Sequence, residues 1–281
     1  MSLHEEKGYT ITRLCKYFGL SRNGYYSSSE GRVREGLSQE LVLGMVLRIR
    51  SLMPRVGGKK LYFMLRDEMD SMGIKMGRDK FFSLLRANGL LIGRKRSFTR
   101  TTDSYHRFRV HKNLIKDLVI DRPCQVYVSD ITYIRLGRKK FCYLFLLTDA
   151  FSRKIVGWCL APDLSITGGL TALKMAMDGR GGNGTLIHHS DRGIQYCSKD
   201  YVKLLVENGV SISMTEENHC YENALAERVN GILKDEFLLD QTFDNIKSAR
   251  AAVKQAVGTY NTFRPHWSLG LRTPQEVNLA I

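Results

Sequence analysis

The sequence predicts an α/β protein in which helical modules precede a mixed β-sheet with helices on its faces. Three observations predict this fold. Apolar residues repeat at helical spacing through most of residues 9–88, three strand-like runs follow one another after residue 122, and strand and helix patterns then alternate. Successive strands favour antiparallel pairing, whereas alternation with helices favours parallel pairing, so one sheet containing both kinds is expected.

Length and charge divide the chain. Its 281 residues favour two or three modules, and a hydrophobic content of 43% is enough for a real core. The formal net charge is +15, and residues 1–120 hold 24 Lys and Arg against 11 Asp and Glu, leaving 19 against 17 in the remainder. The basic excess therefore belongs to the amino-terminal part, which indicates a polyanion partner, with double-stranded DNA as the first candidate.

Cysteine spacing and hydropathy indicate the cellular compartment in which the protein is expected. Six cysteines show no CxxC pair, no charged-then-apolar leader opens the chain, and no apolar run approaches ~18 residues. We therefore expect reduced thiols in a cytoplasmic protein with no membrane partner.

Residues 9–28 predict two short helices, the first ending at Gly19 and the second capped by Ser21. The first helix carries an apolar stripe of Ile11, Leu14 and Phe18. This is the outline of a helix-turn-helix module over residues 1–30, whose second helix, with Arg22, would lie along a DNA groove. An ordinary helical hairpin is the alternative.

A polar linker over 30–38 is expected to lead into a second helix-turn-helix module over 37–92. Its three predicted helices cover 37–52, 60–72 and 78–88. Its candidate phosphate contacts are Lys59, Lys60, Arg78 and Lys80. Each of these, taken alone, is more often a solvated charge.

Residues 93–121 form a basic arm with interleaved aromatic residues and no core-forming period. Its first basic cluster is Arg94, Lys95 and Arg96. We expect this arm to lie on the DNA backbone and to order on binding, with a plain flexible linker as the alternative.

Residues 122–240 predict the α/β domain, and 241–281 a carboxyl-terminal helical extension. The expected strands are 125–135, 141–149, 154–162, 184–187 and 210–214, and the expected helices are 166–177, 199–208 and a segment carrying Glu227.

Three acids occupy informative places in this pattern. Asp130 lies mid-strand on an otherwise apolar face, Asp191 lies just past the carboxyl end of a strand, and Glu227 lies on the polar face of a helix. A buried carboxylate is costly unless it is paired or binds a metal, and converging carboxylates suit hard cations such as Mg²⁺. Each acid alone also has an ordinary explanation: a core salt bridge, a turn and a surface acid, respectively.

The chain resembles the DDE transposases of bacterial insertion sequences, in the subgroup whose catalytic domain is similar to retroviral integrase and ribonuclease H. The matching words are VSDITYI, TDAFSRKIVGW, HHSDRGIQY, CYENALAERVNGILKDE and YNTFRPHWSLGLRTP. The resemblance implies a ribonuclease H-like fold and a two-metal site carried by Asp130, Asp191 and Glu227. It implies two Mg²⁺ ions, with Mn²⁺ as a substitute, and places Lys234 as a phosphate contact.

Other residues near these words are weaker candidates. Gln195, Tyr196 and Asn223 are predicted DNA contacts, while Asp149 and His189 are predicted to support the carboxylates from behind. Residues 215–222 form a polar loop that would close over the site. Arg264 and His266, in the last matching word, are further candidates for contact with DNA or a partner.

The function implied by the resemblance is that of a transposase that binds terminal inverted repeats and catalyses metal-dependent strand cleavage and strand transfer. It also implies a homo-oligomer on DNA, a nucleoid-associated location, and a protein from an upstream reading frame as a partner. Two alternatives stay open from the sequence: a non-catalytic helix-turn-helix regulator, and a ribonuclease H-like nuclease that does not join strands.

Overall fold

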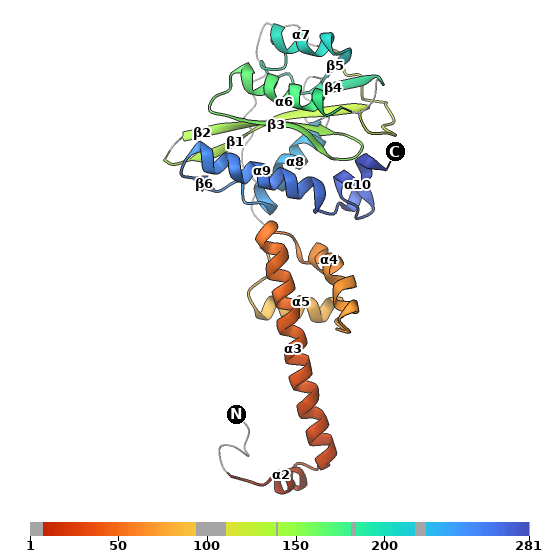
Figure 1. The fold of residues 1–281 in the computed structure, drawn as a ribbon, viewed down its shortest axis with the longest axis vertical. Helices are drawn as coiled ribbons and strands as arrows, with labels where there is room; N and C mark the ends of the chain where they lie inside the picture. Colours follow the sequence, from red (N-terminus) through yellow and green to blue (C-terminus); the bar gives the residue numbers. More distant parts are fainter. Residues whose placement is uncertain (1–7, 94–110, 139, 181–183, 217–222, 281) are drawn as a thin grey trace. The chain divides into compact units, whose positions relative to one another are not determined.

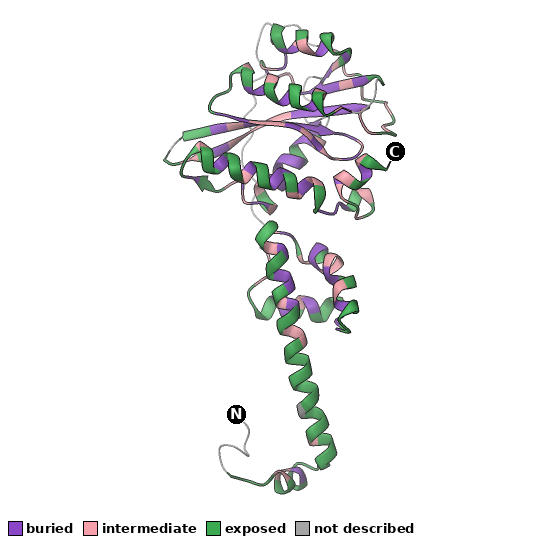
Figure 2. Cartoon of the chain, viewed as in Figure 1, coloured by how far each residue is buried: buried purple, intermediate pink, exposed green. Residues whose placement is uncertain are grey.

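The computed structural model describes residues 8–93, 111–138, 140–180, 184–216 and 223–280. The chain divides into two compact units, one made of residues 1–51 with 57–92 and the other of residues 52–56 with 93–281. Figure 2 shows that each unit has its own set of buried residues, so each is held together by a separate core.

The first unit consists of helices α2 (Ile11–Tyr17), α3 (Arg22–Leu52), α4 (Gly58–Ser71) and α5 (Arg78–Ala87), which Figure 1 labels in order. Its core comes from the facing sides of α3, α4 and α5. The buried side chains include Val42, Val46, Ile49, Leu61, Leu65, Met69, Phe81 and Leu85. Gly73 adopts a positive φ of 69°, which lets the chain turn sharply after α4.

The amino-terminal helices differ from the prediction. Ser21 caps the second helix as expected, its Oγ accepting the Gly24 N–H at 2.9 Å, but that helix is not short. Residues 30–38 lie inside the 31-residue helix α3 and form no linker. Glycine and serine only weakly disfavour helix, and no proline occurs within α3 to stop it.

The apolar stripe predicted on the first helix is also wrong in part. Phe18 is 57% exposed, and the buried side chain of α2 is Cys15.

The described residues of the second unit form a six-stranded sheet, which is mixed, as predicted. Its strands are β1 (Val126–Leu136), β2 (Lys140–Asp149), β3 (Ile155–Ala161), β4 (Leu186–Ser190), β5 (Val210–Met214) and β6 (Thr242–Phe243). The main order is β3-β2-β1-β4-β5, and β6 pairs with the carboxyl end of β1. The first three strands form an antiparallel meander, whereas β4, β5 and β6 are added in parallel. The two-residue strand β6 was not predicted because it has no periodic signal.

Helices cover both faces of the sheet. Figure 1 shows α6 (Ile166–Asp178) and α7 (Lys199–Glu207) on one face and α8 (Ala224–Glu236) and α9 (Ile246–Thr262) on the other. On the first face, α6 packs very close to β3, because a Cβ added at Gly157 would lie 2.1 Å from the Ala172 carbonyl oxygen. On the second face, Ala226 of α8 packs near Val126 and Val128 of β1.

The carboxyl-terminal segment fastens the outer strand. Asn261, near the end of α9, uses its side-chain amide to accept the Ile155 N–H and to donate to the Ile155 carbonyl, both at 2.9 Å. The chain continues through the 3₁₀ turn η2 (Trp267–Leu269) and ends in α10 (Pro274–Leu279). None of the helices in the described ranges has the length and apolar character that crossing a membrane requires.

Candidate active site

Asp130 lies at the middle of β1, on the face covered by α8. Strand alternation gives it the same side as Val126 and Val128, which lie in the apolar cluster beneath α8. Its Oδ2 accepts a hydrogen bond from Asn230 Nδ2 at 2.7 Å, and its Oδ1 accepts the Ile131 N–H at 2.9 Å. The carboxylate is therefore held in one orientation by α8 and by its own strand.

Asp191 reaches the same region because its strand is the parallel neighbour of β1. Ser190, the last residue of β4, pairs with Ser129 of β1, so Asp191 follows β4 directly beside Asp130. Its Oδ1 accepts the Gly193 N–H at 3.0 Å, which forms a tight turn. Arg192 fixes the other side of this turn through its Nε, which donates to the Thr215 carbonyl at 2.8 Å.

Glu227 comes to the site on the first turn of α8, where it is exposed. Asn230 lies one helical turn later and bonds Asp130, which fixes the side of α8 that faces β1. A carboxylate in the first turn of a helix is also favoured by the positive end of the helix dipole.

The three carboxylates share one electrostatic field. The pKa of Asp130 is raised to about 7, mainly by burial and also by the negative charges of Asp191 and Glu227. The hydrogen bonds from Asn230 and the Ile131 N–H act in the opposite direction on this pKa. Within the described ranges, however, no three His, Cys, Asp or Glu side chains are close enough to enclose a metal ion. Asp191 and Glu227 thus affect Asp130 electrostatically, but the three carboxylates do not form a closed cage.

A cation lies at the edge of this field. The Nζ of Lys234, two turns after Glu227 on α8, lies 4.0 Å from the centre of the Tyr133 ring on β1. Burial lowers the pKa of Lys234, and the nearby negative charge of Asp130 raises it in part.

Asp149 and His189, which were predicted to support the carboxylates, form hydrogen bonds elsewhere in the fold. Asp149 is fully buried and builds the turn after β2, accepting the Cys124 N–H at 2.6 Å and the Ser152 N–H and hydroxyl at 2.7 and 2.8 Å. The prediction for Asp149 is therefore corrected to a structural role. His189 is buried, and its Nδ1 lies 2.9 Å from Ser213 Oγ, which ties β4 to β5.

Three of the predicted DNA contacts have buried side chains, which argues against direct contact with DNA in this conformation. Tyr196 is 3% exposed and packs in the core with Tyr201. Asn223 is 3% exposed, and its Nδ2 donates to the Ser129 carbonyl at 3.1 Å, which ties the start of α8 to β1. Lys60 is 9% exposed in the core of the first unit.

The remaining predicted contacts stay predictions. Arg22 and Lys59 are exposed, and Gln195 donates to the Leu164 carbonyl at 3.3 Å. Arg78 and Lys80 are exposed but paired, with Asp79 at 3.0 Å and Glu35 at 2.7 Å. The basic cluster Arg94, Lys95 and Arg96 lies outside the described residues, as does most of the predicted loop before α8.

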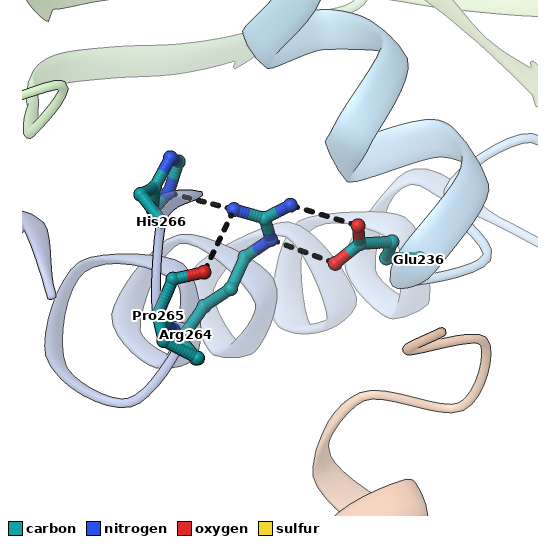
Figure 3. A network of polar contacts seen from close by, with 4 residues as sticks. All are labelled: Glu236, Arg264, Pro265 and His266. Carbon is teal, nitrogen blue, oxygen red and sulfur yellow. Dashed lines mark hydrogen bonds and ion pairs between the residues drawn. The ribbon is translucent and has the colours of Figure 1, made fainter. Parts of the chain in front are cut away.

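Arg264 and His266, which were candidates for contact with DNA or a partner, are instead buried and form a clamp within the fold. Figure 3 shows the Arg264 guanidinium between Glu236, the last residue of α8, and His266. Two parallel hydrogen bonds of 2.7 Å join Arg264 to Glu236, and the His266 Nε2 lies 2.8 Å from Arg264 Nη1. Both Arg264 and His266 are less than 9% exposed, so this motif stabilises the fold.

Three residues of structural importance were missed in the sequence. Asn230 was not predicted to have a role, although its spacing of three residues from Glu227 on the same helix was an available signal. No role was predicted for Tyr133 or for Asn261 either. The pairings of Tyr133 with Lys234 and of Asn261 with Ile155 join distant segments, so no local pattern predicts them.

Comparison with known proteins agrees with this geometry. The Integrase core domain family matches residues 120–220, and a second family of the same description matches residues 208–274. An insertion element IS600 uncharacterized 31 kDa protein of Shigella sonnei is 32% identical over 93% of this chain and 96% of its own. The transposase InsF for insertion sequence IS3A of Escherichia coli is 30% identical over 96% of this chain and 94% of its own.

Among solved structures, the HTLV-2 integrase catalytic core domain in complex with magnesium aligns with 56% of this chain and 97% of its own, at 17% identity and a TM-score of 0.44. The family matches and the two relatives, which the chain covers almost completely, carry the assignment. The protein belongs to the family of insertion-sequence DDE transposases that contain an integrase core domain.

Proposed function

We propose that this protein is a transposase that cleaves DNA at the ends of its insertion sequence and transfers the freed strands to a new site. One observation carries the catalytic part of the proposal. A partly buried carboxylate, Asp130, lies in the field of two further acids, Asp191 on the neighbouring strand's end and Glu227 on a helix. Such a like-charge cluster is unfavourable by itself and becomes favourable when a cation joins it.

The donor set fits a hard divalent cation. The candidates are carboxylate oxygens, which Mg²⁺ and Mn²⁺ prefer, and the burial and repulsion that raise the pKa of Asp130 would be relieved by positive charge. We propose that Asp130, Asp191 and Glu227 hold two such ions. When bound, divalent ions supply activation of the attacking oxygen and stabilisation of the leaving oxygen of a phosphodiester.

The surrounding residues orient this centre. Asn230 and the Ile131 N–H fix the Asp130 carboxylate, while the Gly193 N–H fixes Asp191. Lys234 offers a cation at the edge of the centre, where a DNA phosphate would lie.

DNA recognition is assigned to the first unit. Its helical content, the basic excess of residues 1–120 and the exposed Arg22 and Lys59 support binding of the terminal inverted repeats. We further propose that the chain assembles as a homo-oligomer on DNA and acts where bacterial DNA lies, in the cytoplasm. A protein from an upstream reading frame is a proposed partner.

The test uses a labelled duplex carrying the terminal inverted repeat that flanks the gene. With Mg²⁺ or Mn²⁺, the full chain should nick one strand at the element's end and join the freed 3′-hydroxyl to a target duplex. Asp130→Asn, Asp191→Asn and Glu227→Gln should each reduce cleavage by at least about a thousandfold. Each should still bind the repeat within about threefold of wild type, because unit one is unchanged.

The matched control is Glu207→Gln, which alters an exposed acid on α7. It should cleave and join like wild type. Repeat binding without any metal-dependent nicking would favour a non-catalytic regulator, and nicking without strand joining would favour a nuclease. Either result would contradict the transposase proposal, as would near-wild-type cleavage by any of the three acid variants.

A further inference from the structure

Lys234 and Tyr133 form an unusual pair beside the carboxylate centre. The Lys234 Nζ lies 4.0 Å from the Tyr133 ring centre, well inside the ~6 Å range in which an aromatic face attracts a cation. Among the described residues, no carboxylate lies within ion-pair distance of this ammonium group. The ring therefore positions the charge without neutralising it.

The strand arrangement explains how a helix residue reaches this ring. Tyr133 alternates with Asp130 along β1 and so lies toward the other face of the sheet. On the edge of β1 away from β2, β4 pairs only as far as Ser129, and β6 pairs only from Arg135 onward. The stretch between them has no described strand on that edge, and the Lys234 side chain reaches Tyr133 there.

The Tyr133 ring has an aromatic neighbour on β2. Tyr133 packs edge-on against Phe141 of β2, with ring centres 5.4 Å apart and planes at 87°. The charges around Lys234 are mixed: Asp130, Asp235 and Asp240 attract its ammonium, and Arg135 repels it. These charges come from several residues, whereas the Tyr133 ring is in direct contact with the ammonium.

We infer that Tyr133 is a positioning residue whose ring holds the Lys234 ammonium for a backbone phosphate of the DNA bound at the carboxylate centre. This inference rests on the proposed function and adds a residue to it. The tyrosine hydroxyl is not needed for the role, because the attraction comes from the ring face. Tyr133→Phe should therefore keep the role, and Tyr133→Leu should lose it.

The experiment measures binding of the full chain to the repeat duplex across a salt series, together with the kinetics of strand cleavage. The slope of log K against log salt is negative, and loss of one phosphate contact reduces its magnitude by about 1. Lys234→Met should show this loss and raise KM about tenfold with kcat changed by less than about threefold. Tyr133→Leu should move the slope and KM in the same direction, by up to the same amount, and Tyr133→Phe should match wild type.

Two comparisons separate positioning from simple packing. The double variant Tyr133→Leu with Lys234→Met should be no weaker than Lys234→Met alone, because the tyrosine acts through the lysine. Tyr143→Leu removes a ring from the residue paired with Tyr133 on β2, so it tests loss of packing without loss of the cation contact. It should leave the salt slope unchanged, and thermal melts should show that every variant is folded.

Additive effects in the double variant, or a Tyr133→Leu slope equal to that of wild type, would overturn the inference. A slope change in Tyr143→Leu as large as that in Tyr133→Leu would overturn it too. These results differ from failure of the proposed function, in which the wild-type chain itself would not cleave.

Discussion

The two ends of helix α8 carry acids in opposite circumstances. At its start, Glu227 joins Asp130 and Asp191 in a group of like charges in which Asp130 is partly buried. At its end, Glu236 forms two 2.7 Å hydrogen bonds with the buried guanidinium of Arg264. The same helix therefore carries one acid among like charges and one acid in a bidentate pair.

This difference separates a functional acid from a structural one. A buried bidentate pair satisfies its own charges, so it offers nothing to a ligand and stabilises only the native arrangement. A cluster of like charges lowers stability until a cation binds, and it persists because the surrounding fold holds it in place. Position within a matching sequence word did not separate functional from structural acids, because Glu227 and Glu236 lie in the same word.

The largest effect should come from breaking the paired end. Arg264→Met would leave the Glu236 carboxylate partly buried without its partner, and we expect unfolding free energy to fall by about 3–5 kcal/mol. Urea unfolding of the full chain, followed by circular dichroism, measures this loss. Lys203→Met is the control, because its exposed pair with Glu207 should contribute less than about 1 kcal/mol. Equal, small losses in both variants would show that the clamp is not structural.

A smaller effect should come from His188, a neutral buried group between the two extremes. Its Nε2 lies 2.8 Å from Ser129 Oγ and 3.0 Å from the Tyr201 hydroxyl, and burial lowers its pKa from 6.5 to about 3. The unfolded chain therefore binds a proton below pH 6.5 that the folded chain refuses until about pH 3. The contribution of His188 to the free energy of unfolding should be fully present above pH 6.5. It should fall as the pH drops from 6.5 toward 3.

The loss attributable to His188 should be about 2–3 kcal/mol between pH 7.5 and pH 4.5. It is measured as the difference between the urea-unfolding pH profiles of wild type and His188→Gln. The variant should have lower stability at pH 7.5 but a flatter profile. Parallel profiles would mean that folding does not lower the pKa of His188.

The sheet and the placement of two acids could be predicted because local pattern determines them. The apolar run of β1 fixes the face of Asp130, and the short strand β4 delivers Asp191 at its end. Parallel pairing of these strands then brings the two acids together. The extent of α3 could not be predicted, because weak glycine and serine signals resemble a linker until the whole helix is seen.

Burial of polar residues was the main failure of prediction. Tyr196 and Asn223 both lie in sequence words around the site. Tyr196 is nevertheless packed in the core, and the Asn223 side chain donates to a strand carbonyl. The buried Arg264 is paired with Glu236, an acid 28 residues earlier in the chain. Charge and spacing along the sequence do not report such tertiary partners, so a residue in a matching word is as readily a support of the fold as a contact with DNA.

The central claim is that Asp130, Asp191 and Glu227 form one centre completed by divalent cations. Its most direct test is thermal unfolding of the full chain with and without Mn²⁺. Mn²⁺ should raise the Tm of wild type and of Glu207→Gln, since a ligand that binds the folded state stabilises it. Asp130→Asn should melt higher than wild type without Mn²⁺, by an amount equivalent to about 1 kcal/mol, and should gain little from the ion. An equal Mn²⁺-dependent rise in Asp130→Asn and wild type would contradict the account.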